Sequence, residues 1–144
     1  MIIKNILVPV DGSKYSVKAF NDALDIAKKY GAKISVLTCL EKENISVWCI
    51  NKKVHMQIIK DAEKFAKGFL SKLEKTAKDA NVPLSVHVIE TKSVSKQINN
   101  FAVSEKIDLI VMGSHGRTGF DQFVLGSVSN AVCHSAKCPV LIIK

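Results

Sequence analysis

Short apolar runs alternate with longer amphipathic segments along the chain, and this alternation limits the fold more than any other feature. A short run of Val, Ile and Leu is typical of a strand, and apolar residues at helical spacing are typical of a helix. Alternating strands and helices favour a parallel sheet covered by helices. Strands are expected at residues 5–10, 33–40, 84–89, 108–112 and 140–143. The uninterrupted apolar residues of the first, fourth and fifth runs predict burial on both faces.

Helix signals fill the intervals between these runs. Ser13 is expected to cap the first helix and Gly31 to end it. The second helix carries its apolar residues within 59–80, the third follows Ser93, and the fourth begins near Ser127. The expected order is therefore a strand followed by four helix–strand units.

The length of 144 residues predicts one domain over 1–144, with a core large enough to need neither disulfides nor a metal. No apolar run approaches the roughly 20 residues of a membrane span, and strand-like sequence follows Met1 directly. We therefore expect a cytoplasmic protein with no membrane partner. Cys39, Cys49, Cys133 and Cys138 are expected to stay reduced.

The net charge is +8, from 21 Lys and Arg against 13 Asp and Glu. A positive charge raises the question of a nucleic-acid partner. The lysines are spread over the helical segments, however, and no basic stripe alternates with aromatic residues as it does in single-strand binders. We therefore expect a solvated surface and no nucleic acid.

The segment 113–129 holds the strongest functional motif, with Gly113, Gly116 and Gly126 after the fourth apolar run. Glycine allows positive φ and lets a phosphate approach main-chain N–H groups. Gly126 and Ser127 stand where the next helix begins, so free amides and the helix dipole would face the anion. The hydroxyls of Ser127 and Ser129 can donate further hydrogen bonds. The motif therefore predicts a phosphate site.

Two common phosphate motifs are excluded by the details of this segment. No lysine follows Gly126, as the P-loop of the large NTPases requires. The glycines follow the fourth expected strand, whereas a dinucleotide fingerprint follows the first. The phosphate site is therefore of another type.

Three separated motifs together resemble the universal stress protein family. They are Ile-Leu-Val-Pro-Val-Asp-Gly-Ser at residues 6–13, Gly-x-x-Gly-x9-Gly-Ser at 113–127, and Cys-Pro-Val-Leu-Ile-Ile at 138–143. The resemblance covers essentially the whole chain. It implies a doubly wound, Rossmann-like α/β domain with a five-stranded parallel sheet of order 3-2-1-4-5 and four main helices. It also implies an adenine nucleotide, usually ATP, at the carboxyl ends of the first and fourth strands.

The resemblance also implies which residues contact the nucleotide. Asp11 would hydrogen-bond the nucleoside, Pro9 and Val10 would flank the base, and Cys39 would pack on adenine. Met112, Gly113 and Gly116 would form the nucleotide loop, with Gly126, Ser127, Val128 and Ser129 as its phosphate-contacting turn.

Several of these residues have a second interpretation. Asp11 is also a carboxylate at a helix start, where the dipole stabilises it, and both roles are compatible. His115 and Arg117 are candidates for phosphate contacts in a loop where charged residues are common. Trp48 covers a base or a partner, or packs in the core. Zinc at Cys133, His134 and Cys138 is disfavoured because no fourth ligand is evident, so no metal site is expected.

The leading hypothesis is a regulatory protein of the stress response that binds ATP, or AMP or ADP, with Mg²⁺, and acts on an unknown signalling partner. The alternative is slow ATP hydrolysis or phosphate transfer at the same site, with Asp11, His115 or Asp121 as the base and Arg117 as the cation. A structural module without nucleotide is disfavoured by the complete loop. The family also implies a two-fold homodimer through the apolar final strand, an exposed sheet edge.

Overall fold

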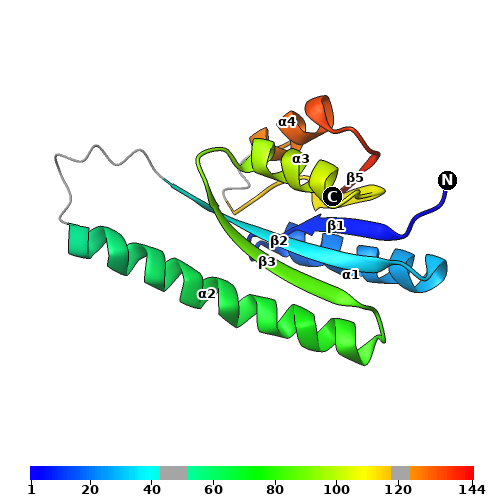
Figure 1. The fold of residues 1–144 in the computed structure, drawn as a ribbon, viewed down its shortest axis with the longest axis horizontal. Helices are drawn as coiled ribbons and strands as arrows, with labels where there is room; N and C mark the ends of the chain where they lie inside the picture. Colours follow the sequence, from blue (N-terminus) through cyan, green and yellow to red (C-terminus); the bar gives the residue numbers. More distant parts are fainter. Residues whose placement is uncertain (43–51, 118–123) are drawn as a thin grey trace.

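The computed structural model describes residues 1–42, 52–117 and 124–144. Within them, a sheet of five parallel strands is covered by four helices (Figure 1). The strands are β1 (Asn5–Pro9), β2 (Lys33–Glu41), β3 (Leu84–Thr91), β4 (Leu109–Gly113) and β5 (Val140–Ile143). The helices are α1 (Lys14–Tyr30), α2 (Lys52–Asp79), α3 (Val94–Ser104) and α4 (Ser127–Ser135). The strand order β3-β2-β1-β4-β5 confirms the expected doubly wound topology.

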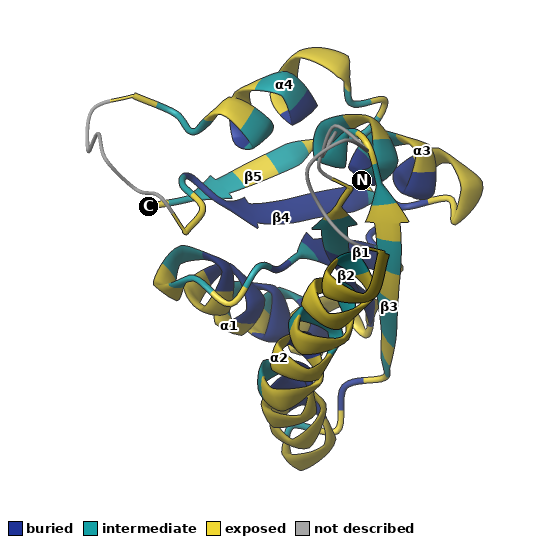
Figure 2. Cartoon of the chain, turned by 90° about the vertical axis from the view of Figure 1, so that its left-hand side faces the viewer, coloured by how far each residue is buried: buried dark blue, intermediate teal, exposed yellow. Residues whose placement is uncertain are grey.

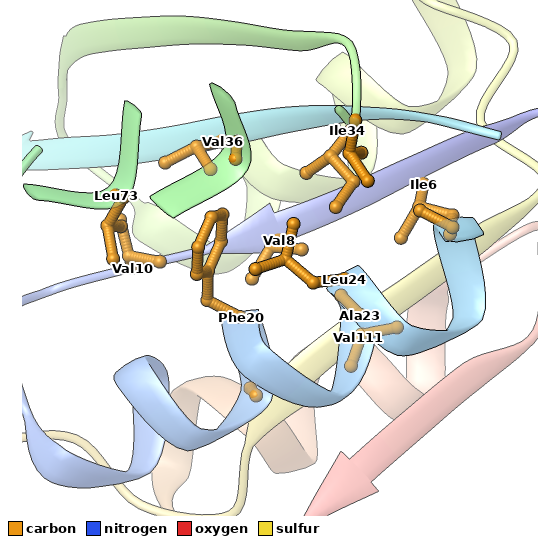
Figure 3. Close-up of a cluster of buried hydrophobic side chains, with 14 of the residues drawn as sticks. Ile6, Val8, Val10, Phe20, Ala23, Leu24, Ile34, Val36, Leu73 and Val111 are labelled. Atoms are coloured by element: carbon orange, nitrogen blue, oxygen red, sulfur yellow. The ribbon is translucent and has the colours of Figure 1, made fainter. Parts of the chain in front are cut away.

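The two faces of the sheet have separate apolar cores. Figure 2 shows buried residues both on α1 and α2, which cover one face, and on α3 and α4, which cover the other. On one face, α1 and α2 cover residues such as Ile6, Val8 and Val111, and Phe20 of α1 is fully buried among them (Figure 3). On the other face, α3 and α4 cover Leu7 and other residues of the second cluster. Alternate residues of β1 thus enter opposite cores, which explains why a central strand is apolar throughout.

The first helix begins and ends where its sequence signals predicted. The Ser13 hydroxyl accepts a hydrogen bond from the N–H of Ser16 at 3.2 Å. Gly31 has a left-handed φ of 65° and donates its N–H to Ala27. Ser93 has the extended backbone of an N-cap residue, but its side chain makes no capping hydrogen bond. The cap signal therefore locates the start of α3 correctly without supplying the bond.

The prediction that β5 is buried on both faces is wrong. All of β4 is buried, but Leu141 of β5 is 39% exposed. The reason is position, since β5 is the last strand of the sheet and has a neighbour on one side only. In the described residues, no helix is both long and apolar enough to cross a bilayer.

Candidate functional site

The sheet opens between β1 and β4 near their carboxyl ends. The two strands are paired at Ile6↔Leu109 and Leu7↔Ile110. Beyond these residues the chain still pairs with β2, because the N–H of Val10 donates to the Leu37 carbonyl at 2.9 Å. Successive residues of a parallel strand direct their N–H groups to opposite sides, so the residue before Val10 would face β4. That residue is Pro9, which has no N–H to donate. Such an opening at a switch in strand order is where doubly wound proteins bind ligands.

A cavity of about 490 Å³ lies at this opening. It is bounded by the end of β1, the end of β2, the loop after β4 and the start of α4. Every residue that the motifs singled out for nucleotide contact lies on its wall: Pro9, Val10, Asp11, Cys39, Met112, Gly113, His115, Gly116, Arg117, Gly126, Ser127, Val128 and Ser129. Segments that are far apart in the sequence therefore meet around one space.

One part of the wall is apolar and includes residues that the motifs did not identify. Leu37 lies beside Cys39, and Val94 and Ile98 come from α3. Their positions had a signal, because Leu37 is two residues before Cys39 on the same strand face and Val94 and Ile98 are one helical turn apart. Also missed were Ser16, Val124 and Leu125. This part of the cavity suits a flat, weakly polar group such as a base.

Another part of the wall is the N-terminus of α4. The first main-chain bond of this turn runs from the N–H of Asn130 to Gly126 at 2.8 Å. The N–H groups of Ser127, Val128 and Ser129 precede it and have no acceptor within the helix. The positive end of the helix dipole lies here as well, so this part of the cavity suits an anion.

Hydrogen bonds fix the start of α4 on the end of β4. The N–H of Gly126 donates to the Ser114 carbonyl at 2.8 Å, and the Ser129 hydroxyl donates to the Gly113 carbonyl at 2.8 Å. We expected the N–H of Gly126 and the hydroxyl of Ser129 to be free to donate to a ligand. This expectation is wrong, because both groups donate to main-chain carbonyls within the protein. Phosphate contacts by these two residues remain predictions.

Of the two general reasons for glycine, positive φ does not apply to the described glycines of this loop. Among the described glycines, Gly12 and Gly31 have positive φ, and those of the loop do not. Close approach explains them instead. A Cβ on Gly113 would lie 2.7 Å from the Tyr15 Cβ of α1, and one on Gly126 would lie 3.0 Å from the Ser114 carbonyl oxygen. The glycines let α1 and the loop approach the end of β4.

Asp11 serves the turn between β1 and α1. Its Oδ1 accepts the N–H of Ser13 at 2.9 Å, so the helix-start interpretation holds. Its Oδ2 points toward the loop after β4, 2.9 Å from where a Cβ on Gly116 would lie. The carboxylate thus lies on the cavity wall with one oxygen bonded to the turn.

His115 and Arg117 reach the cavity from the same loop. The His115 Nδ1 is 3.0 Å from the Ser114 hydroxyl, and its ring lies 5.4 Å from that of Tyr15. Its Nε2 is buried and has no hydrogen-bond partner among the described residues. A buried unpaired ring nitrogen is costly unless a ligand completes it. Arg117 stands over the ring of Phe65, 5.2 Å from its centroid.

Burial raises the pKa of the Cys39 thiol from 9.0 to about 11. The folded protein therefore holds this proton more tightly than the unfolded chain does. The stability that the neutral thiol contributes is complete below pH 9.0 and is lost as the pH rises to about 11. At neutral pH the side chain acts as a small apolar group.

Cys39→Val is expected to remove this part of the pH dependence. Urea unfolding from pH 9.0 to about 11 should show a smaller loss of unfolding free energy in the variant than in the parent. Burial and the charge of Asp108 also raise the pKa of Cys138. This thiol is present in both proteins, so its contribution to the pH dependence cancels in the comparison. Parallel curves for the two proteins would contradict the assignment to Cys39.

The described residues contain no group of three or more His, Cys, Asp and Glu side chains placed to hold a metal ion. Cys133 is exposed, and the His134 Nδ1 lies 2.9 Å from the Asn130 carbonyl within α4. Trp48, Cys49 and Asp121 lie outside the described residues.

Comparison with known proteins identifies relatives of the whole chain. The family model described as "Universal stress protein family" matches residues 3–144. A universal stress protein of Methanocaldococcus jannaschii is 31% identical over 149 residues, which cover 99% of this chain and 83% of the relative.

Solved structures show the same fold. The structure of universal stress protein UspA from Lactobacillus plantarum has a TM-score of 0.84 at 22% identity and covers 100% of this chain and 99% of its own. A universal stress protein from Archaeoglobus fulgidus in complex with dAMP has a TM-score of 0.68 at 23% identity, with 100% of both chains covered. Other similar structures hold cAMP or AMP. The protein belongs to the universal stress protein family.

Proposed function

We propose that this protein binds an adenine nucleotide, ATP in particular, in the cavity between β1 and β4. The observation that carries the proposal is the pairing of an apolar wall with the N–H groups at the start of α4 in one space of about 490 Å³. Universal stress proteins of the same fold have been solved with dAMP, cAMP and AMP, which supports an adenine ligand.

In this proposal the base lies against Val10, Cys39 and the apolar residues of α3, and the phosphates lie at α4. The N–H groups of Ser127, Val128 and Ser129 would donate to phosphate oxygens, and Arg117 would add a positive charge. Asp11 would accept a hydrogen bond from the ribose. Mg²⁺, where present, would neutralise charge on the phosphate chain.

We infer a regulatory role, in which the bound nucleotide shifts a surface for a signalling partner in the cytoplasm or shifts the dimer equilibrium. Rapid phosphoryl transfer needs a positioned base and several cations around the γ-phosphate. On the described wall, Asp11 has one oxygen bonded to Ser13, and Arg117 is the one lysine or arginine side chain. The second candidate function is therefore slow hydrolysis of ATP at this site.

Isothermal titration with ATP, ADP and AMP tests the binding proposal, and phosphate release over hours separates the two roles. We expect saturable binding, with release far slower than nucleotide exchange. Absence of heat with all three nucleotides would reject the proposal. Sustained release at several turnovers per minute would favour the hydrolase.

A homodimer through β5 is the second part of the proposal. As an edge strand with a 39% exposed Leu141, β5 has unpaired backbone groups and an apolar side chain that a second copy would cover. Light scattering after size exclusion should give a dimer for the parent and a monomer for Leu141→Lys. Val88→Lys, on the opposite edge strand and 41% exposed, should remain dimeric. A monomeric parent at micromolar concentration would contradict this interface.

A further inference from the structure

The guanidinium of Arg117 is held from outside the cavity, by a side chain of α2. It stands over the ring of Phe65, with Cζ 5.2 Å from the ring centroid. Within the described part of the chain, Arg117 makes no ion pair or hydrogen bond. Attraction to the ring face is thus its one described interaction, and its N–H donors remain free for an anion.

Phe65 is held in place although it is 54% exposed. Its ring meets that of Phe69 edge-to-face, with the centroids 5.7 Å apart. Both rings also pack under the β1–α1 turn, where a Cβ on Gly12 would lie 3.3 Å from Phe69 and 3.4 Å from Phe65. Gly12 has a φ of 82°, so a side chain there would be strained as well as crowded. The glycine thus admits the ring that supports Arg117.

We propose that Phe65 is a positioning residue for nucleotide phosphates, acting through Arg117. The ring holds the guanidinium on the cavity wall before the ligand arrives, so less side-chain freedom is lost on binding. Because only the phosphates meet the cation, Phe65 raises affinity for nucleotides and leaves affinity for the nucleoside unchanged. This inference rests on the proposed binding of adenine nucleotides.

The test is the ratio of ATP affinity to adenosine affinity, measured by titration. Phe65→Leu keeps an apolar side chain but removes the ring face, and it should lower the ratio about two- to fivefold, the equivalent of an exposed cation–π attraction. Phe65→Tyr keeps an aromatic ring and should have the same ratio as the parent. Arg117→Gln should lower the ratio about tenfold or more, since it removes the charged donor itself.

A double-mutant cycle shows whether Phe65 acts through Arg117. In the Arg117→Gln background, Phe65→Leu should change the ratio no further. Tyr30→Leu is the matched control, because Tyr30 is 52% exposed and carries Lys29 at 6.0 Å over its ring, outside the cavity wall. It should leave the ratio unchanged.

An unchanged or higher ratio in Phe65→Leu would overturn the inference, the higher value meaning that the ring competes with phosphate for Arg117. An equal loss in the parent and Arg117→Gln backgrounds would overturn it too. Failure of the parent to bind ATP and adenosine alike would instead reject the proposed function, so the two failures are distinguishable.

Discussion

Replacing Gly113 with alanine is expected to destabilise the protein by about 1–3 kcal/mol, which is the usual cost of overpacking a well-filled site. The added Cβ would lie 2.7 Å from the Tyr15 Cβ and 2.9 Å from the Tyr15 carbonyl carbon. These atoms belong to the first turn of α1 and cannot move without shifting the helix. Urea unfolding should give a lower midpoint with an unchanged slope.

Gly68→Ala is the matched control for this substitution. Gly68 lies within α2, and nothing is within 4 Å of its added Cβ. Alanine is the better helix former, so this variant should gain about 1 kcal/mol of unfolding free energy. A midpoint for Gly113→Ala at or above that of the parent would show that α1 and β4 are not as close as the structure has them.

Replacing Gly126 with valine is expected to lower ATP affinity by about 10- to 100-fold. The added Cβ would lie 3.0 Å from the Ser114 carbonyl oxygen and 3.4 Å from the His115 Cα, so the start of α4 must move away from the loop after β4. Hydrogen bonds to a charged group contribute about 1.5–3 kcal/mol, and each 1.4 kcal/mol is tenfold in affinity. Isothermal titration with ATP measures the loss.

Two comparisons separate this effect from general damage. Gly68→Val makes the same exchange on α2, outside the cavity wall, and should leave ATP affinity unchanged. Adenosine should bind Gly126→Val nearly as well as the parent, because the apolar wall is intact. ATP affinity equal to that of the parent would remove α4 from the phosphate site.

Local patterns predicted the fold well because each strand is short, apolar and bounded by turn residues. They missed strand ends that are set by pairing with a neighbouring strand. β3 continues past Ile89 because Glu90 and Thr91 pair with Leu40 and Glu41 of β2. The apolar composition of β5 predicted burial on both faces, because a strand at an edge and one inside the sheet can have the same composition.

The residues that line the cavity were easier to predict than the reasons why those residue types are there. Glycine spacing identified the loop, but the neighbour that requires Gly113 is Tyr15, on another element. The sequence showed no acceptor for the Ser129 hydroxyl, because the Gly113 carbonyl to which it donates is 16 residues away and is brought close by the loop. No sequence motif predicts the contact of Phe65 with Arg117. Such pairings arise only when the chain folds.

The central claim is that phosphates bind at the start of α4 while the base lies on the apolar wall. Amide NMR shifts of the parent, with ATP and with adenosine, test it most directly. Both ligands should shift the amides of Cys39, Val94 and Ile98, and only ATP should shift those of Ser127, Val128 and Ser129. Shifts by ATP confined to the lysine-rich surface of α2, with α4 unmoved, would contradict the account.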